Sequence, residues 1–168
     1  MLKALAWIDR MVGEVLKPVV FAGMAGLTFV ITLQIVSRVF FTSVSWTEEV
    51  ARFLLIWITF LGAVLAFQQG RHIAVELARD SLPAPLRWIV SVAATLVVIV
   101  FLATLAKIGW QYMHMQSFQK SPSLRLSMMY VYAVMPLSAA IMAGLSVIDL
   151  LRILAGQGLR ETHMELNE

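Results

Sequence analysis

The chain has 168 residues, of which 60% are hydrophobic and only 14% are charged. Soluble domains carry about 25% charged residues, and so short a chain cannot hide this much apolar surface in one core, so we expect a membrane protein. The absence of cysteine excludes a disulfide framework and a thiolate metal site. The net charge is only +3, and the basic residues suit loops beside a membrane rather than a nucleic-acid partner.

Residues 1–17 are predicted to form an amphipathic helix that lies in the plane of the membrane surface. At 100° per residue, most of the charged residues of this segment fall on one arc and the aliphatic residues fall opposite. Asp9 departs from the pattern, because it lies at the edge of the apolar face. The alternative is a frayed end of the first crossing. A cleaved signal peptide is not expected, because acidic and basic residues interrupt any early apolar core.

The first membrane crossing is expected at residues 18–41. Pro18 suits the first turn of a helix, where its missing N–H costs nothing. Ala22 and Gly26 have the spacing of a small-residue pair that lets two helices approach closely, although such pairs are frequent in apolar sequence. Arg38 lies at the polar far end, where its side chain either snorkels to the interface or joins the acidic residues that follow.

The second crossing, at residues 47–69, begins with a charged cluster. The uncharged run that follows is too short for a bilayer core, which requires about 20 helical residues, so the helix must begin near Glu48. Glu48 and Glu49 precede Arg52 by four and three residues, so both carboxylates can reach its guanidinium on one helix face. Ser45 has capping-box spacing to Glu48, which predicts the start of the helix.

Three interpretations of this cluster remain open. It is a helix cap with a surface ion pair at the headgroup level, a polar seam docked against another membrane subunit, or a substrate or ion site. Charges inside a span are costly, so they usually face protein and pair with one another. Trp46, directly before the acidic pair, suits the aromatic belt at the membrane interface.

Two further crossings are expected after a polar connection, at residues 86–107 and 128–151. In the connection, His72 has no second ligand at a suitable spacing, so we expect no metal site. The third crossing is almost wholly aliphatic, which is typical of a helix that faces lipid. Pro136 lies inside the fourth crossing, where it removes a hydrogen bond to the carbonyl of Tyr132 and predicts a kink.

Together these elements predict an all-α membrane protein, with one four-helix domain at residues 1–155 and a polar tail at residues 156–168. Four crossings put both termini on the same side of the membrane. Eight of the 13 Lys and Arg residues lie in segments on that side and five on the other. The positive-inside rule therefore places both termini in the cytoplasm.

Several segments resemble the small membrane subunit (DctQ-like) of tripartite ATP-independent periplasmic (TRAP) transporters. The most specific is Trp46-Thr47-Glu48-Glu49-Val50-Ala51-Arg52-Phe53, followed by residues 59–63 and 72–76 and then by residues 121–124 with Met128, Val131, Tyr132 and Pro136. The resemblance covers about residues 15–155. One departure is Ser127, where the family commonly has proline.

The resemblance implies a non-catalytic subunit in the bacterial inner membrane, with no cofactor. It implies that a large membrane subunit carries the substrate and ion sites, and that a periplasmic binding protein delivers an organic anion such as a carboxylate or sialic acid. It also implies an ion gradient, usually of sodium, as the energy source. The small subunit acts as a scaffold for the large one and widens its footprint in the bilayer.

Under this resemblance, the cluster of Ser45, Trp46, Glu48, Glu49 and Arg52 is expected to start the helix and to dock against the large subunit. Arg38, Lys120 and Arg125 are candidates for contact with the binding protein, although ordinary solvated loop charge explains them equally well. The competing hypothesis is an autonomous small transporter or channel that assembles as a homo-oligomer through Ala22 and Gly26. An enzyme is not expected, because no nucleophile has an adjacent base.

Overall fold

The computed structural model describes residues 2–40, 45–80 and 84–155. Its helices are α1 (Leu2–Phe40), α2 (Ser45–Asp80), α3 (Ala84–Met115), the short 3-10 helix η1 (Gln116–Phe118), α4 (Met128–Tyr132) and α5 (Val134–Leu154). Four stretches are long and apolar enough to cross a membrane, namely Asp9–Phe40, Ser45–Gly70, Trp88–Phe118 and Met128–Leu154. The expectation of four apolar crossings is therefore confirmed.

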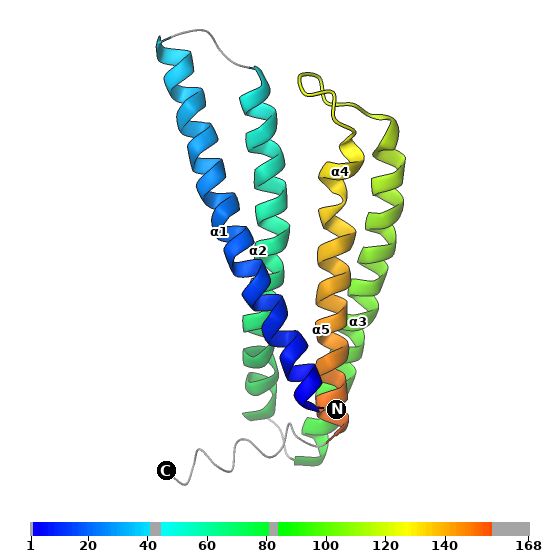
Figure 1. Ribbon diagram of the computed structural model, residues 1–168. Helices are drawn as coiled ribbons and strands as arrows, with labels where there is room; N and C mark the ends of the chain where they lie inside the picture. Colours follow the sequence, from blue (N-terminus) through cyan, green and yellow to red (C-terminus); the bar gives the residue numbers. More distant parts are fainter. Residues whose placement is uncertain (1, 41–44, 81–83, 156–168) are drawn as a thin grey trace, which may run out of the picture.

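The helices stand side by side, and the start of α1 lies at the same end of the bundle as the end of α5 (Figure 1). We call this the terminal end. The opposite end holds the end of α1, the start of α2 and the α3–α4 loop, residues 119–127, and we call it the loop end. The tail at residues 156–168 lies outside the described residues.

The N-terminal segment differs from its prediction, because residues 2–17 are not a separate helix. They form one continuous helix with the first crossing, and Pro18 lies inside it. The physical reason is tertiary packing, since Val12 and Leu16 pack against buried core residues of α2 and α5. Figure 1 shows this first part of α1 crossing obliquely over the lower part of the bundle. Part of the apolar face that predicted contact with a membrane surface thus contacts the chain's own helices, while Val15 of the same face is 53% exposed.

The second helix is longer than its predicted crossing, because α2 continues past residue 69 to Asp80. Gly70 does not end it. The residues that follow include Ala, Leu, Glu and Arg, which are good helix formers, and no proline interrupts them before Pro83. His72 therefore lies on a helix rather than in a loop, and its side chain lies outside the described residues.

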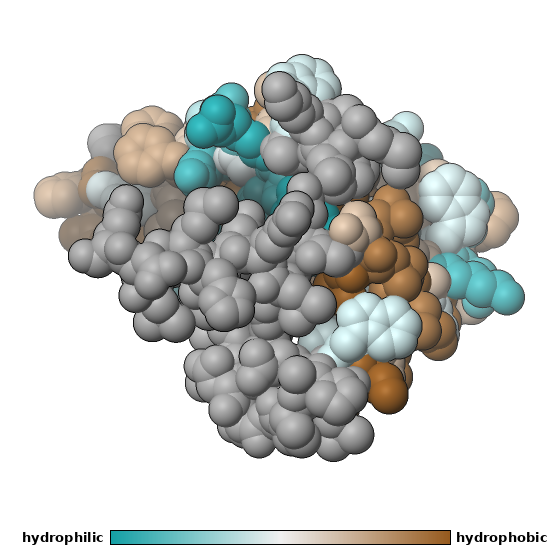
Figure 2. Space-filling model, turned by 90° about the horizontal axis from the view of Figure 1, so that it is seen from below, coloured by the Kyte–Doolittle hydropathy of each residue, from teal (hydrophilic) through white to brown (hydrophobic). Residues whose placement is uncertain are grey.

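The core of the bundle is built around the fourth crossing. Of the residues in its apolar part, 44% are buried, against 6% for α1 and 11% for each of the other two crossings. α5 packs most extensively on α3 and also contacts α2. Val64 of α2 and Leu145 and Ile148 of α5 form the buried centre. The other helices therefore present most of their apolar surface outward, and Figure 2 shows such side chains at the surface beside hydrophilic ones.

The fourth crossing is interrupted at Ala133, between α4 and α5. Pro136 has no N–H to give to the carbonyl of Tyr132, four residues earlier, so the hydrogen-bond ladder has a gap at this point. Ala133 keeps helical backbone angles, with φ of −58° and ψ of −26°, so the chain does not unwind at this interruption. Pro136 is buried against α3, where a Cβ added to Gly109 would lie only 3.2 Å from its nitrogen.

Candidate functional site at the loop end

Glu49 joins the start of α2 to the α3–α4 loop. Its Oε1 accepts a hydrogen bond of 2.8 Å from the backbone N–H of Ser123, and its Oε2 accepts one of 3.1 Å from the N–H of Leu124. The hydroxyl of Ser121 donates a third hydrogen bond to Oε2. These residues lie more than seventy positions apart in the chain. The carboxylate therefore satisfies three donors of a turn that belongs to a different hairpin.

The α3–α4 loop is itself closed by backbone hydrogen bonds that converge on Ser121. Its N–H donates to the carbonyl of Leu126 at 2.9 Å, and its carbonyl accepts from the N–H of Arg125 at 3.0 Å. Ser121 is only 2% exposed, so it is the centre of the loop. Arg125 has a φ of 53°, a left-handed conformation that is strained for a residue with a side chain.

Ser127 closes the other side of the loop and begins α4. Its hydroxyl accepts from the N–H of Met129 at 3.4 Å as the N-cap, and donates to the carbonyl of Ser117 at 3.0 Å. Its φ of −65° is the value to which the proline ring is restricted. Ser127 therefore leaves the turn in a geometry that proline also adopts.

The predicted cluster divides into residues with different surroundings. Glu48 is exposed and turns toward α1, where its Oε1 accepts a 3.2 Å hydrogen bond from Gln34. Arg52 is exposed and lies close enough to Glu49 for electrostatic attraction, but the described residues show no ion pair within 4 Å between it and either carboxylate. Each acidic side chain therefore hydrogen-bonds to a distant part of the chain, and neither forms the ion pair with Arg52 that helical spacing predicts.

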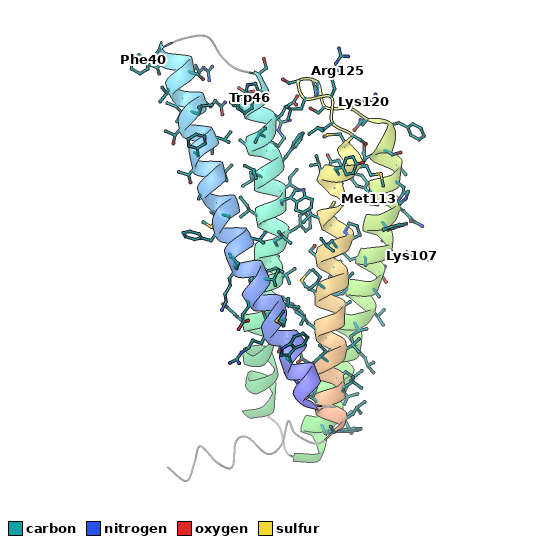
Figure 3. The ribbon with its side chains drawn as sticks, in the orientation of Figure 1. Phe40, Trp46, Lys107, Met113, Lys120 and Arg125 are labelled. Carbon is teal, nitrogen blue, oxygen red and sulfur yellow. The ribbon has the colours of Figure 1, made fainter. Side chains whose placement is uncertain are left out.

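The remaining predicted residues lie at the same end but do not gather into one site. Ser45 is the first residue of α2, where the capping spacing predicted the start, and Trp46 is 42% exposed. Arg38 is exposed in the last turn of α1, while Lys120 and Arg125 are exposed on the α3–α4 loop. Figure 3 shows Trp46 at the tip of α2, near the loop that carries Lys120 and Arg125.

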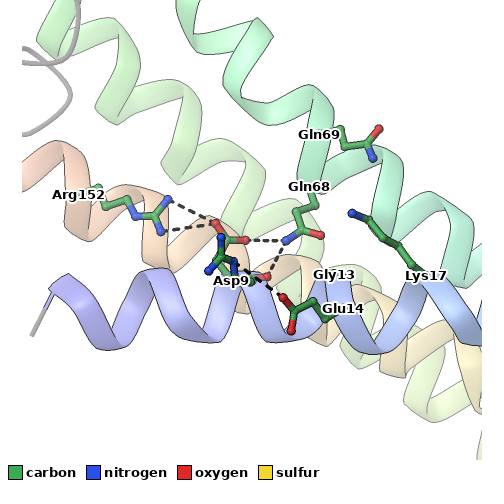
Figure 4. A pocket seen from close by; sticks show the side chains of 8 residues that line it. Asp9, Gly13, Glu14, Lys17, Gln68, Gln69 and Arg152 are labelled. Atoms are coloured by element: carbon green, nitrogen blue, oxygen red, sulfur yellow. Dashed lines mark hydrogen bonds and ion pairs between the residues drawn. The ribbon is translucent and has the colours of Figure 1, made fainter. Parts of the chain in front are cut away.

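A second polar cluster, at the terminal end, was missed by the sequence analysis. Asp9 of α1 accepts from both terminal nitrogens of Arg152 of α5 at 3.4 Å, and Asp149 lies 3.7 Å from the same guanidinium. The side-chain amide of Gln68 on α2 donates to the Asp9 carboxylate at 2.9 Å and to its backbone carbonyl at 2.6 Å. Figure 4 shows Asp9, Gln68 and Arg152 meeting where three helices converge.

This terminal cluster is partly buried, with the Asp9 side chain 14% exposed and that of Arg152 24% exposed. It borders a cavity of about 390 Å³ that is also lined by Gly13 and Lys17. The signal was present in the sequence, because Asp9 lies at the edge of an apolar helix face and a charge in that position needs a partner. The sequence could not identify which basic residue is the partner of Asp9, because that depends on the packing of α5 against α1.

Comparison with known proteins places this architecture in a family. Residues 27–156 match the family model of the DctQ component of tripartite ATP-independent periplasmic transporters. Over 165 residues the chain is 32% identical to the isethionate TRAP transporter permease protein DctMQ of Oleidesulfovibrio alaskensis, which covers 91% of this chain and 24% of that protein.

Two smaller relatives are also similar. A putative TRAP transporter small permease protein of Haemophilus influenzae is 40% identical over 84 residues, which is 49% of this chain and 50% of the relative. The sialic acid TRAP transporter small permease protein SiaQ of Vibrio cholerae is 26% identical over 120 residues, 71% of this chain and 69% of the relative. The chain thus spans about a quarter of the first relative and half of the second. The chain belongs to the DctQ family of small permease subunits of TRAP transporters, and is a transporter component rather than an enzyme.

Proposed function

We propose that this chain is the accessory scaffold subunit of a sodium-coupled TRAP transporter for an organic anion, and that it supports a large membrane subunit that carries the substrate and sodium sites. The observation that carries this proposal is the length of the isethionate permease. The segment similar to this chain makes up only 24% of that protein. Most of that permease is therefore a different polypeptide segment, joined covalently to a part that resembles this chain.

The polar contacts of the bundle support a structural role. At the loop end, the carboxylate of Glu49 is used to hold the chain's own loop. At the terminal end, Asp9 binds Arg152 and Gln68. Both clusters therefore fasten helices to one another at the two ends of the bundle.

The exposed surface offers the area that a large partner and lipid would cover. Phe21 and Phe29 of α1 are 76% and 68% exposed, and Phe101 of α3 is 63% exposed. Exposed apolar surface on this scale marks contact with a membrane or a protein. At the start of α2, the exposed Arg52 is the charged member of the cluster that remains available to the large subunit.

The charge distribution supports an orientation with both termini in the cytoplasm, and the periplasmic binding protein then approaches the loop end. Arg38, Lys120 and Arg125 are exposed there. The substrate class follows from the relatives, which are named for isethionate and sialic acid, and both compounds are organic anions.

The glycine contacts weigh against an autonomous homo-oligomer. A Cβ added to Gly23 would lie 2.9 Å from the side chain of Ile58, and one added to Gly26 would lie 3.8 Å from Leu54. Both contacts are with α2 of the same chain, so Gly23 and Gly26 serve packing within the subunit. Ala22, the other member of the predicted pair, is exposed.

Reconstituted transport tests the proposal. The chain, the large permease proposed as its partner and the proposed binding protein are purified and placed in proteoliposomes singly and together, with an inward sodium gradient. We expect uptake of labelled substrate only when the large permease, the binding protein and this chain are all present. Uptake by this chain alone would establish the autonomous transporter instead, and full uptake without it would remove the scaffold role.

A further inference from the structure

We propose that Glu49 is a positioning residue that, through Ser121, holds Arg125 in a strained conformation from which it contacts an acidic surface of a periplasmic partner protein. This proposal rests on the proposed function, in which the loop end faces the binding protein. It adds a residue that shapes the contact without taking part in it, and it names the chemistry of the partner's surface. Charge complementarity selects that chemistry, because the two charged residues of the loop, Lys120 and Arg125, are both basic.

The first step of the argument is the strain at Arg125. Its φ of 53° is a conformation that glycine, asparagine and aspartate adopt far more readily than arginine. A strained residue persists only when the surrounding structure fixes it, and such strain gathers at functional positions. Among the described residues, Arg125 is the only one other than glycine with positive φ, and it is exposed on the loop.

The second step is the chain of contacts that fixes it. The N–H of Arg125 donates to the carbonyl of Ser121 at 3.0 Å, so the placement of Ser121 decides the placement of Arg125. The hydroxyl of Ser121 donates to Glu49, whose carboxylate also accepts from the N–H groups of Ser123 and Leu124. Without this carboxylate the three donors of the turn lose their shared acceptor.

The third step is the charge that the loop presents. Lys120 and Arg125 are exposed, and the described residues contain no carboxylate within 4 Å of either one. Because the backbone of the loop is fixed, only the two cationic side chains have to be ordered on binding, which favours a partner with complementary acidic groups. In this arrangement Glu49 holds the shape of the loop, while Lys120 and Arg125 bind the partner.

Two measurements test the positioning role, with Glu48→Gln as the matched control. Glu48 is adjacent, has the same chemistry and bonds to Gln34 rather than to the loop. In the full chain in lipid nanodiscs, Glu49→Gln should speed hydrogen exchange at the N–H groups of Ser123 and Leu124 by about tenfold or more, because a neutral amide cannot accept all three hydrogen bonds. Glu48→Gln should leave the exchange unchanged, and Ser121→Ala should give an intermediate increase. Unchanged exchange in Glu49→Gln overturns the proposal.

The docking role is tested by transport in proteoliposomes that hold the complete transporter, with the concentration of loaded binding protein varied. Glu49→Gln should raise the KM for the binding protein by about fivefold and leave the maximal rate unchanged, because a looser loop must be ordered on binding. Arg125→Gly should raise the KM as well, although glycine relieves the strain and keeps the loop ordered. Arg125→Lys, which keeps the positive charge, should leave the KM close to that of the unaltered protein.

The outcomes separate the two parts of this inference, positioning of the loop and contact with the binding protein. The scaffold role is decided separately, by uptake with and without this chain. If Arg125→Gly and Lys120→Ala both leave the KM unchanged while Glu49→Gln still loosens the loop, the contact with the binding protein is overturned and the positioning of the loop stands. If Arg125→Gly raises the KM while Glu49→Gln loosens the loop without changing the KM, positioning is not needed for docking and the present inference is overturned. A fall in maximal rate with unchanged KM in Glu49→Gln also overturns it.

Discussion

The packing of α3 on α5 at Gly109 gives the sharpest prediction about the bundle. A Cβ added to Gly109 would lie 3.2 Å from the nitrogen of Pro136, 3.3 Å from its Cδ and 3.4 Å from its Cα. Unstrained contacts between carbon atoms lie at about 3.5–4.0 Å. The neighbouring atoms belong to the backbone and to a rigid ring, so they cannot turn aside as a flexible side chain would. Any side chain at position 109 therefore forces the two helices apart.

The expected cost follows from these distances. For Gly109→Ala, the overlap is a few tenths of an ångström, and its cost of about 1 kcal/mol nearly cancels the gain in helix propensity of about 1 kcal/mol. For Gly109→Val, two further methyl groups enter the same contact, and overpacking costs about 1–3 kcal/mol. We therefore expect a small effect for alanine and a net loss of about 2 kcal/mol for valine.

Gly144 supplies the matched control, because it lies on α5 and a Cβ added there would meet nothing within 4 Å. Gly144→Val should change the free energy of unfolding by less than about 0.5 kcal/mol. The assay is unfolding of the purified chain in mixed micelles with increasing dodecyl sulfate, followed by far-UV circular dichroism. Equal stabilities of Gly109→Val and Gly144→Val would refute the reasoning, because they would show that the α3–α5 contact adapts without strain.

Three further predictions concern Asp9 and Ser127 and use the same assay. Asp9→Asn should lower the free energy of unfolding by about 1–2 kcal/mol, since it removes the partly buried carboxylate that Arg152 binds at 3.4 Å. The control Glu14→Gln, at a side chain 64% exposed, should lower it by less than about 0.5 kcal/mol. Equal losses in the two variants would contradict a stabilising role for the Asp9–Arg152 contact. Ser127→Ala should cost about 1 kcal/mol by removing the cap on the N–H of Met129. Ser127→Pro should keep the fold, since φ is already −65°; loss of folding would show that this loop does not accept proline.

The number of crossings and their approximate places were predictable because they depend on properties of single segments. A bilayer core requires a fixed length of apolar helix, so long runs without charge are recognisable without knowledge of their neighbours. α2 begins at Ser45, where the sequence spacing predicts the helix start, and the fourth crossing is interrupted near Pro136, which has no N–H. Both features could be read from local sequence.

The N-terminal segment shows why contacts between helices were harder to predict from the sequence. Its pattern of charged and apolar residues is amphipathic. Such a pattern predicts that the apolar face is buried, but it does not tell whether lipid or another helix buries it. Val12 and Leu16 pack on the bundle. Asp9, the residue that departed from the pattern, faces Arg152 and Gln68 from two other helices. Identifying those partners requires the arrangement of helices, which helical periodicity does not contain.

The acidic pair at the start of α2 shows the same competition between local and tertiary contacts. Helical spacing places both carboxylates within reach of Arg52, but a surface ion pair contributes little, because water solvates each charge well and two long side chains must be ordered. Glu49 instead binds three donors of the loop, two of them backbone N–H groups that are already fixed in place. A pre-ordered set of donors costs less entropy than a long flexible cation, so the tertiary contact prevails. Arg52 is then left without an ion pair in the described part of the chain, so it is the charge in this cluster that we propose for docking to the large subunit.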